Sequence, residues 1–174
     1  MGEPRRNVEL KCRCRDLEGL RARALAAGAR EAGVLDQRDT FFHGGRARLK
    51  LRELGAGRSE LISYQRPDVT GPRTSAYRIA PVERPAELAA VLEQALGTAG
   101  VVVKRRRLLL LRNTRLHLDE VEGLGTFAEL ETVLSGQTEA EGERELGEIA
   151  TALGLDEADR VAVPYVELLR LLPP

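Results

Sequence analysis

The stretch that decides the fold runs from Thr114 to Glu131 and reads TRLHLDEVEGLGTFAELE. Polar residues alternate with apolar ones on both sides of a glycine-rich turn, and this period of two predicts two strands joined as a hairpin. Because successive side chains of a strand point to opposite faces, Asp119, Glu129 and Glu131 are expected to share one face, with the leucines on the other.

Glu129 and Glu131 place two carboxylates close together on one strand, and their repulsion costs stability unless a cation lies between them. Oxygen ligands of this kind suit hard divalent metals. A Glu-Leu-Glu sequence taken alone fits a solvated strand face better, so the choice between the two interpretations depends on the rest of the chain.

The chain has 174 residues, 43% of them apolar and 31% charged, which indicates one globular domain over residues 1–174. Tryptophan is absent and only 3% of residues are aromatic, so base stacking is a poor mode of binding for this chain. No apolar run approaches the roughly 20 residues of a membrane span, and the first residues lack the apolar segment of a signal peptide. With Cys12 and Cys14 expected to be packed, reduced thiols, we predict a cytoplasmic protein that does not bind membranes.

Alternation of the same kind predicts six further strands before the hairpin. They cover residues 6–15, 37–43, 46–53, 59–66, 74–79 and 101–111. Helices are expected after the N-cap Asp16, at Pro85, after a capping box formed by Thr138 and Glu141, and near Pro164. Most connections between strands are too short for parallel crossovers. We therefore predict an α+β fold, in which an eight-stranded antiparallel β-barrel has helices packed outside.

Several of these strands carry one apolar face and one charged face, and the charges cluster by sign. They are basic in residues 46–53 and 101–111 and acidic in the last strand. A solvated face would mix the two signs, and the helices need an apolar surface on which to pack. This pattern predicts that the charged face lines the lumen of the barrel and that the apolar face lies outside.

The predicted lumen therefore holds more cations than carboxylates. Its cations are Lys11, Arg13, Arg48, Lys50, Arg52, Lys104, Arg106 and Arg115, and its carboxylates are Glu9, Asp119, Glu129 and Glu131. The excess is about four positive charges, and a triphosphate carries roughly four negative ones near neutral pH. A metal–triphosphate ligand would suit such a lumen.

Five motifs follow one another along the chain. They are Asn7-Val-Glu9-Leu-Lys11, Arg48-Leu-Lys50-Leu-Arg52, the basic residues 104–107, the stretch 115–125 and Glu129-Leu-Glu131. Together they resemble the CYTH domain, or triphosphate tunnel family, which includes class IV adenylate cyclases, thiamine triphosphatases and inorganic triphosphatases. The resemblance extends over nearly the whole chain. It implies an eight-stranded tunnel that binds a triphosphate together with one or two divalent metals, Mg²⁺ or Mn²⁺.

The resemblance also implies roles for individual residues. The metal ligands would be Glu9, Asp119, Glu129 and Glu131. The phosphate-binding residues would be Lys11, Lys50, Arg52, Arg66, Lys104 and Arg106, with Lys11 also catalytic. The facing of residues 104–107 stays open, so Arg105 and Arg107 are alternatives to Lys104 and Arg106. For His117 we expect a structural hydrogen-bonding role rather than a catalytic one.

One position departs from the family pattern, because Asn7 stands where the Glu-x-Glu-x-Lys signature has its first glutamate. An amide oxygen can still ligate a metal, but it carries no charge. The substitution therefore leaves open whether a second metal binds and whether the site is fully active.

These residues predict a metal-dependent enzyme that hydrolyses a triphosphate-containing small molecule such as tripolyphosphate, thiamine triphosphate or ATP. One alternative is a class IV-type adenylate cyclase that makes cyclic AMP and pyrophosphate, the branch that the run LDEVEGLG resembles most. A second is a non-catalytic polyphosphate or nucleotide sensor, which Asn7 favours. Nucleic-acid binding is disfavoured by the zero net charge and the few aromatic residues. All of these readings are compatible with a homodimer.

Overall fold

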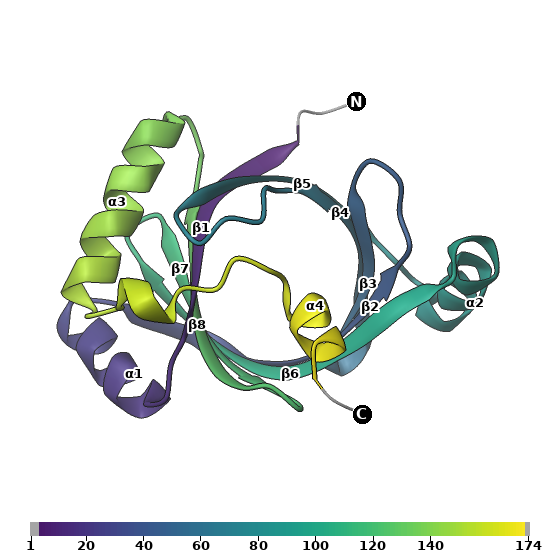
Figure 1. Ribbon diagram of the computed structural model, residues 1–174, viewed down its shortest axis with the longest axis horizontal. Coiled ribbons are helices and arrows are strands. Elements are labelled where there is room, and N and C mark those ends of the chain that lie inside the picture. The colour runs from purple at the N-terminus through teal and green to yellow at the C-terminus, as the bar shows by residue number, and fades with distance from the viewer. Residues whose placement is uncertain (1–3, 173–174) are drawn as a thin grey trace.

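The eight predicted strands form one closed barrel in which every neighbouring pair is antiparallel (Figure 1). The structure is a computed structural model, and it describes residues 4–172. The strands are β1 (Arg5–Arg13), β2 (Arg30–Phe42), β3 (Arg48–Leu54), β4 (Arg58–Gln65), β5 (Arg73–Pro81), β6 (Thr98–Leu111), β7 (Thr114–Val121) and β8 (Gly125–Val133). Around the barrel their order is β1-β5-β4-β3-β2-β6-β7-β8, and β8 pairs with β1 to close it. The predicted fold class is confirmed.

Strand β2 is longer than its sequence pattern predicts, since it begins at Arg30 rather than at residue 37. Its first half pairs with β6, and a register shift occurs between Glu31 and Gly33. The backbone of Gly33 has a φ of 118°, which a residue without a Cβ adopts readily. Pairing with a distant strand, which local alternation does not report, extends β2 to this point.

Within residues 4–172, four helices lie outside the barrel wall or at its opening. They are α1 (Leu17–Ala26), α2 (Pro85–Leu96), α3 (Glu139–Ala152) and α4 (Tyr165–Arg170), and two single 3₁₀ turns cover residues 55–57 and 157–159. The predicted caps are confirmed: the side chain of Asp16 accepts a hydrogen bond from the Gly19 amide, and Thr138 and Glu141 form a capping box. Among the residues described, no helix is long and apolar enough to cross a membrane.

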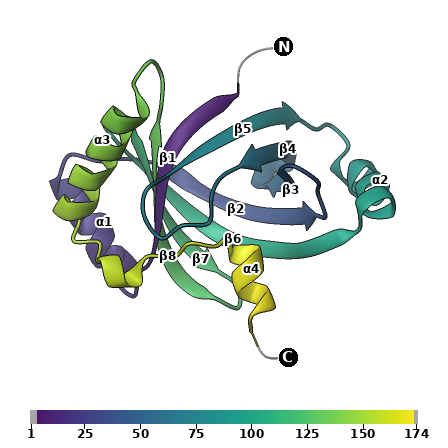
Figure 2. The same cartoon turned by 45° about the horizontal axis from the view of Figure 1, so that its top comes forward.

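The larger hydrophobic core lies between the outer face of the barrel and the helices α1 and α3, which Figures 1 and 2 show on one side of it. Leu20 of α1 and Leu146 of α3 are fully buried there, against outward side chains such as Leu10 and Leu116. Burying each leucine contributes about 1.5–3 kcal/mol. The apolar strand faces are therefore covered from outside, as predicted, and the polar faces are left for the lumen.

A second core lies where the C-terminal segment meets the barrel. Tyr165 and Val166 at the start of α4 pack with Val102 of β6 and Phe127 of β8, and the rings of Tyr165 and Phe127 meet edge to face at 4.9 Å. In Figure 1 the chain that leads into α4 runs across the barrel opening. This segment also contacts the lumen, because Arg73 donates a hydrogen bond to the Val161 carbonyl.

Candidate functional site

The lumen of the barrel contains a cavity of about 150 Å³ lined mainly by charged side chains. Seven cations line it: Lys11, Lys50, Arg52, Arg66, Lys104, Arg106 and Arg115. Four carboxylates line it: Glu9, Asp39, Glu129 and Glu131. The excess among these lining residues is three positive charges, so the sign of the predicted excess is confirmed and its size is one charge smaller. Polar and charged strand faces thus turn inward, as predicted.

Strand register explains how the acidic end of the cavity is assembled. Glu129 on β8 lies opposite His117 on β7 and opposite Lys11 on β1. Two residues further along β8, Glu131 has its own partners on these strands: Arg115 on β7 and Glu9 on β1. A period of two along each strand therefore gives two adjacent rows of charged and titratable groups.

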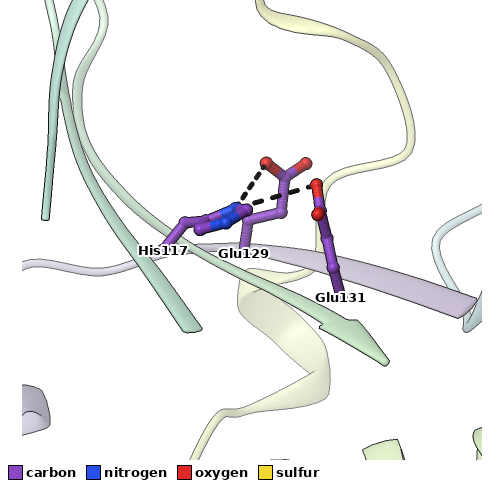
Figure 3. A group of neighbouring side chains, drawn as sticks. All are labelled: His117, Glu129 and Glu131. Atoms are coloured by element: carbon purple, nitrogen blue, oxygen red, sulfur yellow. Dashed lines mark ion pairs between the residues drawn. The ribbon is translucent and has the colours of Figure 1, made fainter. Parts of the chain in front are cut away.

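His117, Glu129 and Glu131 form a group in which one potential ligand atom from each residue lies within 4.8 Å of the others. Figure 3 shows the two glutamates converging on the imidazole, whose Nδ1 lies 3.6 Å from Glu129 Oε2 and 3.7 Å from Glu131 Oε1. This Nδ1 is buried and has no hydrogen-bond partner in the described part of the chain. An oxygen-rich group with a spare nitrogen donor fits a divalent cation.

Glu9 lies beside this group but faces two arginines. Its Oε1 lies 3.0 Å from Arg66 Nη1 and accepts a 3.1 Å hydrogen bond from Arg73 Nε. Burial raises the pKa of the Glu9 carboxyl, and the nearby Glu129 raises it further. Arg73, which is fully buried, was missed by the sequence interpretation because it lies at the first position of β5, where alternation is not yet established.

Asp119 is surrounded by cations and is not in the histidine–glutamate group. Arg106 holds both of its oxygens at 2.6 Å, Lys104 Nζ lies 3.3 Å away, and the Tyr165 hydroxyl donates a 3.0 Å hydrogen bond. Although burial alone would raise the pKa of the Asp119 carboxyl, Arg106 and Lys104 hold it well below its usual range. The structure thus places Asp119 as the counter-ion of the cations predicted to bind phosphate.

Asp39 on β2 is the counter-ion of the basic residues of β3, and it was not predicted from the sequence. It accepts hydrogen bonds of 2.8 Å from Lys50 and of 2.7 and 2.8 Å from Arg52. Burial alone would raise the pKa of the Asp39 carboxyl, but Arg52 and Lys50 hold it well below its usual range. The sequence contains a signal for this role, because Asp39 lies on the same face of the predicted strand as Gln37 and Phe41.

Burial lowers the pKa of all three lysines that line the cavity, and for Lys50 and Lys11 the shift is large. Burial lowers the pKa of Lys50 to about 7, and the neighbouring charge of Arg52 contributes. Burial also lowers the pKa of Lys11 to about 8. The Nζ of Lys11 lies 3.7 Å from Glu129 Oε1 and 3.9 Å from the centre of the Tyr165 ring. Both lysines are therefore poised to change charge near neutral pH.

The facing of the basic strand β6 is now defined. Lys104 and Arg106 are buried in the lumen, Arg105 is exposed, and Arg107 pairs with Glu18 of α1 at 2.6 Å. Lys104 and Arg106 therefore face the lumen, as first predicted, and the alternative pair of Arg105 and Arg107 does not.

Two cations of the predicted lumen set do not line the inner cavity, and neither does the predicted carboxylate Asp119. Arg13, at the end of β1, is exposed and lies over the ring of Phe127, and Arg48 pairs with Asp68 and lines a second cavity. Both residues lie at strand ends, where alternation alone does not show whether a side chain reaches the lumen.

This second cavity, of about 720 Å³, adjoins the first, and Phe41, Tyr64 and Arg66 line both. Its other lining residues include Phe42, His43 and Arg46. Aromatic and basic side chains thus surround a wider space beside the charged lumen. This space is not predicted by the sequence, because the few aromatic residues that line it lie in separate parts of the chain.

Asn7, the residue that departs from the motif, also lines the inner cavity. It is buried, and its Oδ1 has no hydrogen-bond partner among the described residues. An unpartnered amide oxygen beside a carboxylate group is available to a bound ligand or to water.

Solved structures share the fold over nearly the whole chain. A Pyrococcus horikoshii protein, PH1012, has a TM-score of 0.85 and 26% identity, with 94% of this chain and 99% of that chain covered. A proposed adenylate cyclase from Vibrio parahaemolyticus has a TM-score of 0.79 and 22% identity, with 98% and 99% covered. Another from Bacillus halodurans has a TM-score of 0.62 and 17% identity, with 99% and 100% covered.

No curated protein sequence matches this chain. The family model described as the CYTH domain, however, matches residues 5–165. That match covers all eight strands of the barrel and every residue assigned above to the inner cavity, and it confirms the resemblance found in the five motifs. The chain therefore belongs to the CYTH domain family, the triphosphate tunnel family.

Proposed function

We propose that the protein is a divalent-metal-dependent enzyme that hydrolyses a triphosphate-containing small molecule inside the barrel. The observation that carries this proposal is the division of the cavity into two parts. Glu129 and Glu131 offer ligands to a cation at one side, where three of the seven lysines and arginines also approach them, and the other four line the rest of the cavity. A triphosphate with a bound cation has the complementary distribution of charge.

The cations would bind the phosphate oxygens. Lys50, Arg52, Lys104 and Arg106 are held in place by Asp39 and Asp119, so little conformational entropy is lost when a triphosphate binds. Arg66, held by Glu9, adds a charge beside the wider cavity. Fixed positive groups stabilise the charge that develops on a transferring phosphoryl group.

Glu129 and Glu131 would hold Mg²⁺ or Mn²⁺, with Glu9 beside them. When bound, such a metal supplies Lewis acidity and lowers the pKa of a coordinated water. Lys11, between Glu129 and the Tyr165 ring, is positioned to donate a hydrogen bond to an oxygen of the reacting phosphate. Its pKa of about 8 keeps it mostly protonated at pH 7. Water would attack the terminal phosphorus and lose a proton to the solvent, while the bond between that phosphorus and the bridging oxygen breaks and the remaining phosphate chain leaves with that oxygen.

Adenylate cyclase activity is the second candidate, and the adjoining cavity favours it. A space of about 720 Å³ lined by Phe41, Phe42 and Tyr64 can accept a nucleoside whose triphosphate lies in the lumen. Two of the structural relatives are proposed adenylate cyclases. In that reaction the oxygen of the ribose 3′-hydroxyl attacks the α-phosphorus and the hydroxyl proton is lost. The bond between the α-phosphorus and pyrophosphate breaks, and pyrophosphate leaves.

Product analysis distinguishes these functions. The pure protein is incubated with Mg²⁺ or Mn²⁺ and, separately, with tripolyphosphate, thiamine triphosphate and ATP, and the products are identified by ion-exchange chromatography. Orthophosphate from one substrate supports the hydrolase and names its substrate. Cyclic AMP with pyrophosphate from ATP would replace the hydrolase by the cyclase. If all three compounds stay intact while tripolyphosphate binds tightly, the protein is a sensor, and Asn7 is the first residue to replace with glutamate.

A further inference from the structure

We propose that His117 is itself a metal ligand, and that the set formed by His117, Glu129 and Glu131 makes the site prefer Mn²⁺ to Mg²⁺. The inference rests on the metal site of the proposed function and adds to it a nitrogen ligand and a metal preference. Sequence reasoning gave His117 only a structural hydrogen-bonding role.

The surroundings of the imidazole give the first argument. The His117 side chain is only 6% exposed, yet its Nδ1 has no hydrogen-bond partner among the residues described. Its distances to the two glutamate oxygens, 3.6 and 3.7 Å, are too long for hydrogen bonds. Leaving a buried polar group unsatisfied costs about 1–3 kcal/mol. A cation between the three side chains would satisfy the nitrogen and both carboxylates together.

The spacing of the donor atoms gives the second argument. Ligands of small divalent metals lie about 2.0–2.2 Å from the ion, so two ligands of one ion are at most about 4.4 Å apart. The three potential ligand atoms lie within 4.8 Å of one another without an ion between them. Side-chain movements of a few tenths of an ångström would therefore complete the set, and no backbone change is needed.

The strand register gives the third argument, since it fixes all three donors. His117 lies directly opposite Glu129 in the β7–β8 ladder, and Glu131 follows two positions later on the same face. Arg106 donates a 2.8 Å hydrogen bond to Glu129 Oε2, and Arg115 lies 3.6 Å from Glu131. The cation would therefore share each carboxylate with an arginine. This sharing weakens the electrostatic attraction between the carboxylates and the cation, so the nitrogen ligand contributes a larger part of the binding.

Ligand chemistry then predicts which metals the site prefers. Mg²⁺ favours oxygen ligands and retains its waters, whereas imidazole nitrogen binds later divalent ions more tightly, with Mn²⁺ the weakest of that series. A site of two carboxylates and one imidazole is therefore expected to bind Mn²⁺ more tightly than Mg²⁺. Replacing His117 with glutamine should reduce this preference.

The test uses Mn²⁺ alone with the untagged protein, so it does not depend on any substrate. The chain contains two histidines, and His43 lines the outer cavity instead. Pulsed electron paramagnetic resonance of bound Mn²⁺ should show coupling to an imidazole nitrogen in the wild type. The H43Q variant, whose one remaining histidine is His117, should retain this coupling. The H117Q variant should lose it and bind Mn²⁺ at least about tenfold more weakly, with a smaller change for Mg²⁺.

Two results would overturn the inference in distinguishable ways. If wild-type protein binds Mn²⁺ without nitrogen coupling, and the E129Q variant binds it more weakly, His117 is not a ligand but the carboxylate site of the proposed function remains. If the wild type and E129Q bind Mn²⁺ equally, the carboxylate site fails as well. Because the H43Q result is decisive by itself, the test does not depend on whether H117Q folds.

Discussion

Arg106 binds Asp119 inside the barrel through two parallel hydrogen bonds, each 2.6 Å long, in the bidentate geometry that suits a guanidinium and a carboxylate. The same Arg106 also reaches Glu129 at 2.8 Å. One arginine thus connects the cations predicted to hold phosphate with the carboxylates predicted to hold the metal. Asp119 is therefore expected to position these groups rather than to bind the metal.

The first prediction concerns this counter-ion. D119N should lower the free energy of unfolding by about 3–5 kcal/mol, because it removes the buried carboxylate with which both Arg106 and Lys104 pair. Arg106 would then keep Glu129 as its one remaining ion-pair partner among the described residues. The measurement is urea denaturation at pH 7. The control is E120Q, which changes the exposed neighbour on the same strand and should alter stability by less than about 0.5 kcal/mol. Equal stability of the two variants would show that Asp119 is not the counter-ion described here.

The second prediction compares neighbouring residues of β6 that face opposite ways. K104Q should weaken binding of tripolyphosphate by about 10- to 100-fold, the value of one charged hydrogen bond, because Lys104 lies in the lumen. R105Q should leave binding unchanged, because Arg105 is exposed. Calorimetric titration with a chelator present measures binding without turnover. An equal loss in both variants would mean that tripolyphosphate binds on the outer surface.

The third prediction follows from the pKa of Lys50, which is about 7 in the free protein. A bound triphosphate favours the charged amine and raises this pKa, so the protein takes up protons on binding. Lys50 should contribute about half a proton at pH 7. Affinity therefore decreases as pH rises above 7, relative to a variant that keeps its charge.

The variant for this comparison is K50R, since arginine stays protonated throughout this range. Calorimetry in buffers of different ionisation enthalpy measures the uptake, and K50R should take up less than the wild type by about this amount. Lys11, with a pKa of about 8, should supply the uptake that remains at higher pH. Identical uptake by wild type and K50R would contradict the assignment of Lys50 to the phosphate site.

The fourth prediction concerns how α3 packs on the barrel. A Cβ at Gly142 would lie 2.6 Å from Leu134 and 3.1 Å from the buried Val8, whereas a Cβ at Gly147 would meet no atom within 4 Å. Both substitutions by alanine gain the same helix propensity. The Leu134 side chain must move to admit this Cβ, so G142A should be less stable than G147A by about 1 kcal/mol. Urea denaturation of the two variants measures this difference, and equal stability would show that α3 does not approach β1 this closely.

The fold was largely predictable because polar and apolar residues alternate within most of the strands. Arg48, Lys50 and Arg52 alternate with leucines in the sequence, and the sign of the clustered charges predicted a lumen rather than a solvated face. Strand ends were less predictable. The first half of β2 is defined by its pairing with β6, and no pattern within residues 30–36 shows that partner.

The pairing of charges within the lumen could not be read from the sequence, because it depends on register between strands that are far apart in the chain. Asp39 lies 11 residues before Lys50, and Glu9 lies 64 residues before Arg73. Alternation predicts which side chains face inward, but not which ones meet. For the same reason, sequence alone did not separate Asp119, held by cations, from Glu129 and Glu131, which converge on His117.

The most direct test of the central claim is the metal dependence of triphosphate turnover. Initial rates are measured for the wild type, E131Q and R105Q on the substrate that reacts fastest among the three proposed, with Mn²⁺ and then with excess chelator. We expect the wild type and R105Q to react at equal rates and E131Q to react at least about 100-fold more slowly. The chelator should stop turnover by all three proteins. Equal rates for the wild type and E131Q, or no turnover of any of the three substrates by the wild type, would contradict the account.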